Sequence, residues 1–508
     1  MSGRRSQSAG RGDRRAARSR EALRAIAVAV LLSLAAFALS GCAPKPPPRP
    51  KNVLLITIDT LRSDRLAAYG NPIVRTPTLD RLARDGAVFA TAHSPIPLTL
   101  PSHASILTGV YPRTHLVLSH AYTLAPTRPT LASILKEHGY QTAAFVSSHV
   151  LDKKYGLDRG FDTYWQRWAA DMNATRAMNV AGLELTTKAA KEWLKKRPDG
   201  PFFLWVHLFQ PHKPYTPPAP LDRLYDPGYT GTMVAEVDTL HRIWRDRIAL
   251  APADLAHLSA LYDGEVTTAD IEVGRLLATV EAEGHLDDTI IVITSDHGEV
   301  LYEHDFYFGH DIMLYQPAIN VPLLMRAPGL IPAGRVVGQP VRLIDVAPTL
   351  LDAVGIPPSE VGRFEGMSLI ALAERASGTG PSRDSRGALR SFRAPRGSGA
   401  APAAPPDTLF AEVFPPKAEW KVKPRHAVAT SRWKLILEDE SDARELYDLA
   451  LDPMERENVA AAEPDTLASF LAAWEAWRAS KEKEFVTTYP DIDAETEETL
   501  RSLGYIDK

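Results

Sequence analysis

Thr99 carries a hydroxyl, a weak nucleophile, at the expected start of a helix. Pro101 follows two residues later, and proline suits the first turn of a helix, so the residues up to Thr108 are expected to be helical. The start of a helix presents free N–H groups and a positive dipole end, which favour the oxygens of a phosphate or sulfate. The hydroxyl still needs a base or a metal to lower its pKa. Taken alone, Thr99 is more simply a loop or capping residue.

Two carboxylates and two imidazoles are expected to meet this hydroxyl. Asp59 ends one apolar run, the Asp296-His297 pair follows a second, and His212 follows a third. In open α/β sheets, functional sites form beyond the carboxyl ends of the strands. Each aspartate alone would more simply cap a turn or a helix. Together, Asp59, Asp296 and His297 can bind a metal that activates Thr99 and polarises an ester oxygen.

The elements that position these groups are indicated by alternating apolar runs and helical patterns. Runs that suit strands buried on both faces occupy residues 52–58, 142–146, 201–209, 289–294 and 321–325. Helical patterns occupy residues 78–85, 130–138, 183–196 and 255–283. This alternation predicts an α/β layered domain with a mostly parallel central sheet flanked by helices.

The remainder of the chain differs in composition from this catalytic domain, which is expected to span residues 51–374. Residues 375–407 are rich in Ser, Gly, Arg, Ala and Pro and are expected to be a disordered insertion or linker. Residues 408–508 are expected to form a small C-terminal α+β subdomain with a terminal helix. Its predicted strands cover residues 427–437 and 444–448, and its predicted helix covers residues 467–483.

The first fifty residues indicate export and anchoring. An arginine-rich stretch precedes an apolar run at residues 25–39, which is too short for a comfortable membrane span but suits a signal peptide. The sequence Leu39-Ser40-Gly41-Cys42 then resembles the bacterial lipobox, whose cysteine is lipidated. Residues 1–42 are therefore expected to be a lipoprotein signal peptide, and residues 43–50 a proline-rich tether. The alternative is a cleaved secretory signal with an incidental cysteine.

This anchor predicts a location in the cell envelope, with the catalytic body outside the cytoplasm. Ala43, rather than Asp, follows the cysteine, which favours the outer membrane of a Gram-negative host, facing the periplasm or the exterior. Hydrophobic residues make up 45% and charged residues 24%, as in soluble globular proteins. A net charge of −4 argues against nucleic acid as a partner. The single cysteine excludes an intrachain disulfide framework and a cysteine-based metal cage.

Several motifs in order make the chain resemble the sulfatase family of the alkaline phosphatase superfamily. The resemblance implies that Asp59, Asp296 and His297 are metal ligands and that Thr99 is the nucleophile, which also touches the metal. His212 then falls on a histidine that contacts the transferred group or protonates the leaving group. The matching segments are residues 52–62, 99–109, 201–218, 262–266, 294–299, 345–351 and 445–458.

Two further positions follow from the resemblance. His310 falls near a place that is often a lysine or histidine contacting the transferred group. Glu299 and Glu303 follow the metal pair and more simply orient it than bind the metal. Trp205 is expected to be a core residue.

The nucleophile segment departs from the family pattern. Typical sulfatases carry Cys or Ser in a Cys/Ser-x-Pro-x-Arg motif that is oxidised to formylglycine, whereas this chain reads Thr99-Leu100-Pro101-Ser102-His103. Threonine is not a substrate for that maturation, and His103, which is expected to be a catalytic residue, replaces the arginine that supports the aldehyde hydrate. Both departures indicate a plain hydroxyl nucleophile. In the superfamily such threonines are typical of phosphodiesterases, phosphonate-releasing enzymes and phospho-headgroup transferases.

These residues predict a metal-dependent hydrolase of phosphate or sulfate esters, with phosphoesters favoured. A phosphoryl-threonine can be hydrolysed by water, whereas a sulfated hydroxyl is hard to cleave. The alternatives are a true sulfuric ester hydrolase, a transferase acting on an envelope glycan or lipid, and a non-catalytic surface binding protein.

The metal is expected to be a divalent ion. Oxygen and imidazole ligands admit Zn, Mn, Mg or Ca, and the histidine slightly disfavours Ca. One metal is favoured over two because Gln210 occupies a place where a second site would use a carboxylate. A second site remains open because several histidines could serve it, namely His207, His212, His304 and His310.

Overall fold

The computed structural model describes residues 49–167, 175–305, 308–376, 408–414 and 423–481. The predicted signal peptide, most of the predicted tether and nearly all of the predicted insertion lie outside these ranges. Within them, no helix combines the length and the apolar character needed to cross a membrane.

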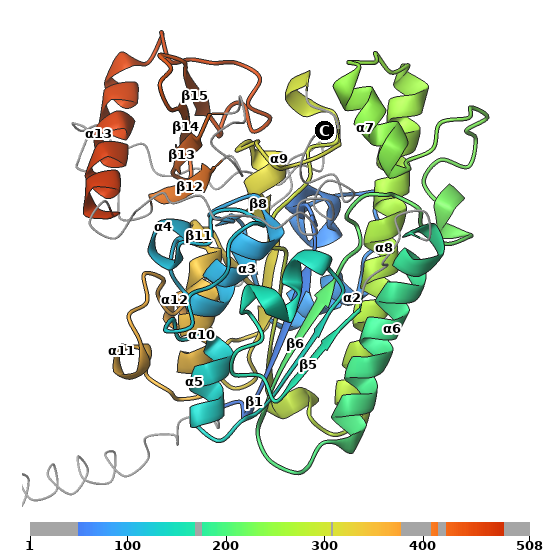
Figure 1. Cartoon of the computed structure of the whole chain (residues 1–508), viewed down its shortest axis with the longest axis vertical. Helices are drawn as coiled ribbons and strands as arrows, with labels where there is room; N and C mark the ends of the chain where they lie inside the picture. Colours follow the sequence, from blue (N-terminus) through green and yellow to red (C-terminus); the bar gives the residue numbers. More distant parts are fainter. Residues whose placement is uncertain (1–48, 168–174, 306–307, 377–407, 415–422, 482–508) are drawn as a thin grey trace, which may run out of the picture. The chain divides into compact units, whose positions relative to one another are not determined.

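An eight-stranded sheet forms the centre of the catalytic domain (Figure 1), in the order β10-β2-β9-β7-β1-β6-β4-β5. Only β9 among these strands is antiparallel to its neighbours, β7 and β2, which confirms the predicted mostly parallel sheet. The strands are β1 (Asn52–Ile58), β2 (Ala87–Phe89), β4 (Gln141–Val146), β5 (Thr163–Gln166), β6 (Phe202–Leu208), β7 (Thr289–Thr294), β9 (Leu323–Arg326) and β10 (Arg335–Val337).

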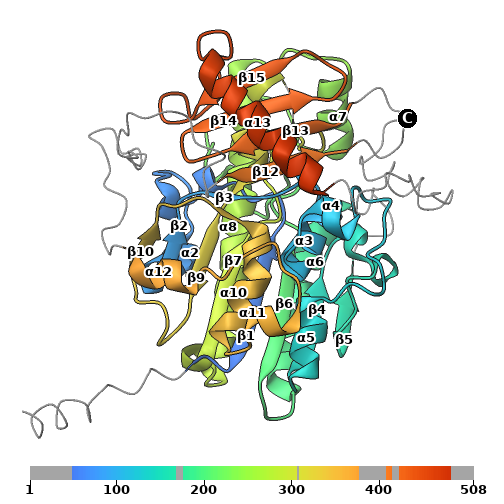
Figure 2. The same cartoon turned by 90° about the vertical axis from the view of Figure 1, so that its left-hand side faces the viewer.

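Helices cover both faces of this sheet, which explains why its central strands are continuous apolar runs. Along β1, Val53 and Leu55 join one hydrophobic core while Leu54, Ile56 and Ile58 join the other. The first core includes α3 (Thr99–Thr108), α5 (Leu131–Glu137) and α10 (Val346–Ala353). The second includes α2 (Pro77–Asp85), α6 (Thr175–Lys196) and α8 (Pro252–Ala282). In Figure 1 the sheet lies between α3, α5 and α10 on one side and α6 and α8 on the other, and Figure 2 looks onto the strands with α5 and α10 in front of them.

The predicted strand at residues 321–325 is wrong in one respect, because Pro322 divides it. Proline has no N–H to donate to a ladder, and the chain changes sheets there. One part is β8 (Asn320–Val321), the edge of a three-stranded sheet in the order β11-β3-β8; the other part is β9 in the central sheet. The carbonyl of Pro322 accepts a hydrogen bond of 2.7 Å from the Thr294 hydroxyl instead.

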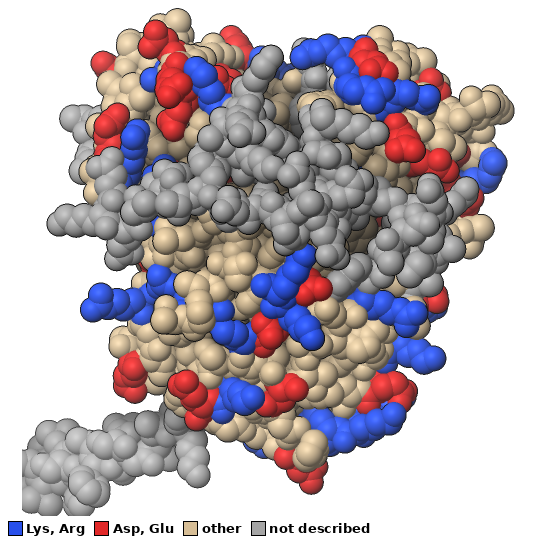
Figure 3. Space-filling view, viewed as in Figure 1, with Lys and Arg blue, Asp and Glu red and all other residues tan. Residues whose placement is uncertain are grey.

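Short elements complete the catalytic domain. They are β3 (Ala92–His93), β11 (Val341–Arg342), α4 (Pro112–His115), α7 (Val237–Arg245), α9 (Gln316–Ile319), α11 (Pro358–Val361) and α12 (Ile370–Arg375). On the face drawn in Figure 3, the basic and acidic side chains of the described residues are interspersed. Mixed charge of this kind suits a surface in contact with water.

A four-stranded antiparallel sheet and a helix form the C-terminal subdomain, as predicted. The sheet has the order β12-β13-β14-β15, and α13 (Pro464–Lys481) packs Phe470, Ala473 and Trp474 against it. The predicted single strand at residues 427–437 is instead a hairpin, because Thr430 turns the chain with hydrogen bonds to Trp433. The strands are β12 (Leu409–Val413), β13 (Arg425–Ala429), β14 (Trp433–Glu438) and β15 (Arg444–Asp448).

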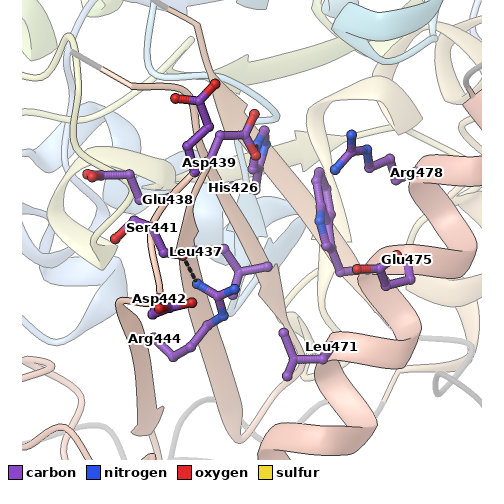
Figure 4. Close-up of a pocket in the computed structure, with 12 residues that line it drawn as sticks. His426, Leu437, Glu438, Asp439, Ser441, Asp442, Arg444, Leu471, Glu475 and Arg478 are labelled. Atoms are coloured by element: carbon purple, nitrogen blue, oxygen red, sulfur yellow. Dashed lines mark hydrogen bonds and ion pairs between the residues drawn. The ribbon is translucent and has the colours of Figure 1, made fainter. Parts of the chain in front are cut away.

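A buried chain of charged groups joins α4 to this subdomain. Arg113 lies 2.7 Å from Glu412, and the His426 ring lies between the carboxylates of Glu412 and Asp439, 2.9 Å from each. Burial acts to lower the pKa of His426, but the two carboxylates raise it above its ordinary value. Figure 4 shows His426 and Asp439 at a pocket between the sheet and α13, whose Trp474 stacks on the His426 ring.

We expect His426 to make the stability of the protein depend on pH. A histidine whose pKa is raised by folding contributes fully below its unfolded pKa of about 6.5, and the contribution is lost as the pH rises through the folded pKa. His426→Gln should therefore lower the thermal midpoint at pH 6 and have a smaller effect at pH 9. Each unit of pKa increase corresponds to about 1.4 kcal/mol.

The control is His138→Gln, which changes an exposed histidine at the end of α5. Thermal unfolding of both variants across this pH range provides the measurement. Equal losses for His426→Gln at pH 6 and pH 9 would contradict the charged role of His426.

Candidate active site

Four predicted site residues meet at the carboxyl edge of the central sheet. Asp59 follows β1, Asp296 and His297 follow β7, and Thr99 is the first residue of α3; all four are 0% exposed. The His297 Nε2 atom lies 3.2 Å from Thr99 Oγ1. It also lies 3.4 Å from Asp296 Oδ2 and 3.8 Å from Asp59 Oδ1. The structure therefore brings together a hydroxyl, two carboxylates and an imidazole.

The loops that present these groups are tied to one another. The Ser295 hydroxyl donates to the carbonyl of Ile58, 2.6 Å away, and accepts from the N–H of Leu61 at 2.9 Å. This single side chain therefore fixes the loop after β7 against the loop after β1. The hydroxyl of Ser102, one turn into α3, donates to the Asp296 carbonyl at 2.7 Å and fixes the start of α3 to the same loop.

Thr60, next to Asp59, has a strained backbone. Its φ of 55° is in the left-handed region, where a β-branched residue is an outlier. Strain of this kind persists only where the surroundings over-determine it. The Tyr262 hydroxyl donates to the Thr60 carbonyl at 2.7 Å, and the Thr60 N–H points to Asp296 Oδ1 at 3.4 Å. The site therefore holds the backbone beside Asp59 in a conformation that the sequence alone would not choose.

Gly298 shows how closely the loop after β7 packs. A Cβ atom there would lie 2.0 Å from the carbonyl oxygen of Pro317. The Gly298 N–H donates to the carbonyl of Ala318 at 2.7 Å. A larger residue would force this backbone to shift, which accounts in local steric terms for the glycine after Asp296-His297.

The hydrogen bonds of His297 determine which ring nitrogen carries the proton. Its Nδ1 lies 3.0 Å from the carbonyl of Gly298, which only accepts, so Nδ1 is the donor. The lone pair of Nε2 therefore faces Thr99, whose hydroxyl donates to it across 3.2 Å. A metal-ligating histidine typically has one nitrogen held by a carbonyl in this way, and a bound metal would take the lone pair of Nε2 in place of the Thr99 hydrogen.

The carboxylates fit a bound cation. Both side-chain oxygens of Asp59 and Oδ2 of Asp296 are buried and accept no hydrogen bond from the described residues. One ligand atom each from Asp59, Asp296 and His297 lie within 4.8 Å of one another. Burial, together with the charge of Asp296, raises the pKa of Asp59 well above its ordinary value. Two buried carboxylates this close need a proton or a cation between them.

A second group of potential ligands consists of His103, His207 and Asp296. Both nitrogens of His103 already have partners: Nδ1 lies 2.7 Å from the Thr99 carbonyl and Nε2 lies 3.0 Å from the Thr57 hydroxyl. No nitrogen of His103 is left to ligate a second metal while these bonds exist.

His212 and His310 lie beside His297. The ring centroids of His297 and His310 are 4.2 Å apart, and those of His310 and His212 are 5.4 Å apart. Burial acts to lower the pKa of His310, but Asp311 and Glu299 raise it above its ordinary value. Burial, together with the neighbouring His310, holds the pKa of His212 well below its ordinary value. His310 is thus the more readily protonated of the two imidazoles, and His212 is the less readily protonated.

Other predicted residues support this centre from a distance. Glu299 contacts His310 at 3.3 Å, and Glu303 pairs with Arg62 at 2.7 Å. His304 lies outside the cluster of rings and stacks on Tyr315. Trp205 is fully buried, as a core residue should be, but its N–H also donates to the Thr57 hydroxyl at 3.0 Å.

Sequence reasoning missed three polar residues at the site. Asp311 contacts His310 Nε2 at 3.4 Å, and its place directly after a candidate histidine was an available signal. Ser295 sits directly before the Asp296-His297 pair, but serine at a strand end is common. Thr57 had no signal, since it is one more buried position in an apolar strand.

Known proteins of one family are similar to this chain in sequence. The sulfatase family model matches residues 51–356. An N-acetylglucosamine-6-O-sulfatase of Bacteroides thetaiotaomicron is 25% identical over 509 residues, covering 85% of this chain and 86% of that protein. Arylsulfatase K of Mus musculus is 26% identical over 492 residues, covering 86% of this chain and 82% of that protein.

Solved structures share the fold. The phosphonate monoester hydrolase of Agrobacterium radiobacter superposes with a TM-score of 0.66 at 22% identity, covering 88% of this chain and 99% of that one. A protein solved in complex with its substrate D-glucosamine-2-N,6-O-disulfate superposes with a TM-score of 0.64 at 23% identity, covering 86% and 99%. The same architecture therefore occurs in proteins named for phosphonate and for sulfate substrates.

We expect Asp59→Asn to stabilise the chelated protein and to abolish its response to metal. When folding raises the pKa of a carboxyl, the protein becomes less stable as the pH rises above the pKa of that carboxyl in the unfolded chain, about 3.9. At pH 7 the neutral amide removes that loss, so the thermal midpoint in EDTA should rise by on the order of 3 °C. Adding Zn²⁺, Mn²⁺, Mg²⁺ or Ca²⁺ should raise the thermal midpoint of the parent protein and leave that of Asp59→Asn unchanged.

Asp162→Asn is the matched control, because Asp162 is ion-paired with Lys136 at 2.6 Å on the surface. This variant should keep the full metal response. A metal-induced shift that survives in Asp59→Asn would refute Asp59 as a ligand.

Proposed function

The chain belongs to the sulfatase family of the alkaline phosphatase superfamily, a family of metal-dependent ester hydrolases, and we propose that it cleaves phosphoesters, with Thr99 as the nucleophile. The observation that carries this proposal is the Thr99 hydroxyl, 3.2 Å from His297 Nε2 at the start of α3. The preferred substrates are phosphodiesters or phosphonate monoesters.

The first step is an in-line displacement at phosphorus. Thr99 Oγ1 forms a bond to phosphorus while the bond to the leaving-group oxygen breaks. When bound, a divalent ion at Asp59, Asp296 and His297 lowers the pKa of the hydroxyl and polarises an ester oxygen. The free N–H groups and dipole of the start of α3 stabilise the negative oxygens of the transferred group.

The leaving group requires a proton, and His212 and His310 are the imidazoles in position to provide it. In the second step a water attacks phosphorus from the side that the leaving group vacated. The bond between phosphorus and Thr99 Oγ1 then breaks, and the hydroxyl regains its proton. Each step removes one proton from the attacking hydroxyl or water and delivers one proton to the departing oxygen, so one imidazole would accept a proton while the other donates one.

Phosphorus is favoured over sulfur because of the nucleophile itself. Thr99 has no route to a formylglycine, and a sulfated threonine would have to be released by direct attack of water. His103 supports the same view, because the arginine associated with the aldehyde hydrate is absent from its position.

Sulfate esters are the second candidate, and the names of the relatives favour them. Both the bacterial relative and the mouse relative described above are named as sulfatases. One of the similar structures was solved with a sulfated glucosamine. If sulfate is the substrate, a sulfated sugar of a glycan is the class that these names suggest.

A substrate panel with two Thr99 variants tests the proposal. The full chain should turn over a nitrophenyl phosphodiester or a phenylphosphonate monoester faster than nitrophenyl sulfate. Thr99→Ala should lower kcat by about 1,000-fold or more, because the covalent step is lost. Thr99→Ser should keep measurable turnover, because the hydroxyl remains. Dominant sulfatase activity would reverse the substrate preference, and an active Thr99→Ala variant would remove the nucleophile assignment.

The location proposed for this enzyme is the cell envelope, with a lipid on Cys42 anchoring the catalytic domain outside the cytoplasm. The lipobox-like sequence Leu39-Ser40-Gly41-Cys42 supports this. An envelope glycan or lipid is then the accessible ester substrate. Cys42→Ser should move the protein from the membrane fraction to the soluble fraction, with unchanged activity per molecule. Retention of the Cys42→Ser variant in the membrane fraction would argue against the lipid anchor.

A further inference from the structure

A chain of hydrogen bonds runs from the core of the sheet to the nucleophile. The indole N–H of Trp205 on β6 donates to the Thr57 hydroxyl on β1, 3.0 Å away. The Thr57 hydroxyl lies 3.0 Å from His103 Nε2, and His103 Nδ1 lies 2.7 Å from the backbone carbonyl of Thr99. Each of these four residues is 0% exposed.

The two ends of the chain determine the direction of its first and last hydrogen bonds. A carbonyl only accepts, so His103 Nδ1 carries a hydrogen and donates it to Thr99. An indole N–H only donates, so Trp205 takes one lone pair of the Thr57 hydroxyl. In the neutral ring, His103 Nε2 keeps a lone pair, and the Thr57 hydroxyl donates its own hydrogen to it. The chain of bonds then holds the ring in the tautomer with its hydrogen on Nδ1.

The His103 ring has no free edge for substrate or metal. Its centroid lies 5.3 Å from the Trp205 ring and 5.1 Å from the His207 ring. Its closest approach to a carboxylate is 3.6 Å, from Nδ1 to Asp296 Oδ2, but that nitrogen already donates to Thr99 across 2.7 Å. Because both of its nitrogens are engaged, His103 affects the site by holding Thr99 in place.

The first turn of α3 depends on such outside support. Leu98 is its N-cap and provides no side-chain hydrogen bond to the turn. The His103 side chain reaches back one turn to hold the Thr99 carbonyl, while Ser102 ties the same turn to the Asp296 carbonyl. Thr99 is therefore fixed from two sides at the residue that must approach the reacting atom.

We propose that Trp205, Thr57 and His103 form a positioning relay that sets the orientation of Thr99, with His103 in contact with neither the substrate nor the metal. This inference rests on the proposed nucleophilic role of Thr99. In this relay His103 takes the place that an arginine has in the usual family motif. A small displacement of a nucleophile is enough to reduce the rate greatly.

Substitutions at Thr57 test the relay. Thr57→Val removes the hydroxyl and keeps the shape, whereas Thr57→Ser keeps the hydroxyl. Thr142→Val is the matched control, because Thr142 is a buried threonine on β4 whose hydroxyl also donates and accepts, to Gly160 at 2.7 Å and from Asp162 at 2.9 Å. Thr142 lies near the amino end of its strand, away from the site.

The readouts are kcat, KM, metal content and thermal midpoint, all measured on the full chain. Both valine variants should lower the thermal midpoint by a similar amount. Thr57→Val should also lower kcat by about tenfold or more, with KM and metal content unchanged, and Thr57→Ser should restore most of it. Equal kcat values for Thr57→Val and Thr142→Val would overturn the relay.

Variants of His103 distinguish a positioning role from metal ligation. Asparagine places an amide near the position of Nδ1, so His103→Asn should keep more kcat than His103→Gln, whose amide lies nearer the position of Nε2. Neither variant should change the number of metal ions bound per chain. A loss of bound metal would overturn the proposal in favour of the ligand group formed by His103, His207 and Asp296. An active Thr99→Ala variant would instead refute the proposed nucleophile, whatever the result at Thr57.

Discussion

Two carboxylates, Asp59 and Asp296, are fully buried at the ends of adjacent parallel strands, and most of the site follows from that constraint. Like charges in a low-dielectric interior repel strongly unless a cation or a proton lies between them. The repulsion is built in by the register of the sheet, which pairs Thr57 of β1 with Thr294 of β7. The charge of Glu299 adds to the repulsion at Asp59, whereas His297 acts against it.

The fold provides this register because the two strands lie at its centre. β1 pairs on one side with β7 and on the other with β6, so the ends of three strands reach the same edge. Helices on both faces exclude water from the strands and from the bases of the loops. Asp59 and Asp296 are 237 positions apart in the chain, yet Ser295, with one hydroxyl, connects their two loops.

The sequence predicted these strand ends well because a fully buried strand is a mainly apolar run, and the first carboxylate after the run marks the edge of the sheet for β1 and β7. It predicted interruptions poorly. Pro322 and Thr430 each divide a run that hydropathy presents as one strand, because the division depends on hydrogen-bond donors and turns rather than on apolar character. The relay to Thr99 was also beyond reach from sequence, since Thr57 and Trp205 have the appearance of core residues and become partners only when β1 and β6 pair.

His103 illustrates how environment rather than residue type decides a role. A histidine four residues after a candidate nucleophile, in the place of a family arginine, has the spacing of a catalytic group. Burial, acting against the nearby Asp296 charge, lowers its pKa to about 3, so it stays neutral at physiological pH. A neutral ring with both nitrogens engaged can orient Thr99 but adds no positive charge beside it. In the proposed mechanism, the positive charge beside the transferred group would come from the start of α3, from His310 and from a cation bound at Asp59 and Asp296. An arrangement of that kind suits a nucleophile that needs its proton removed and has no aldehyde hydrate to support.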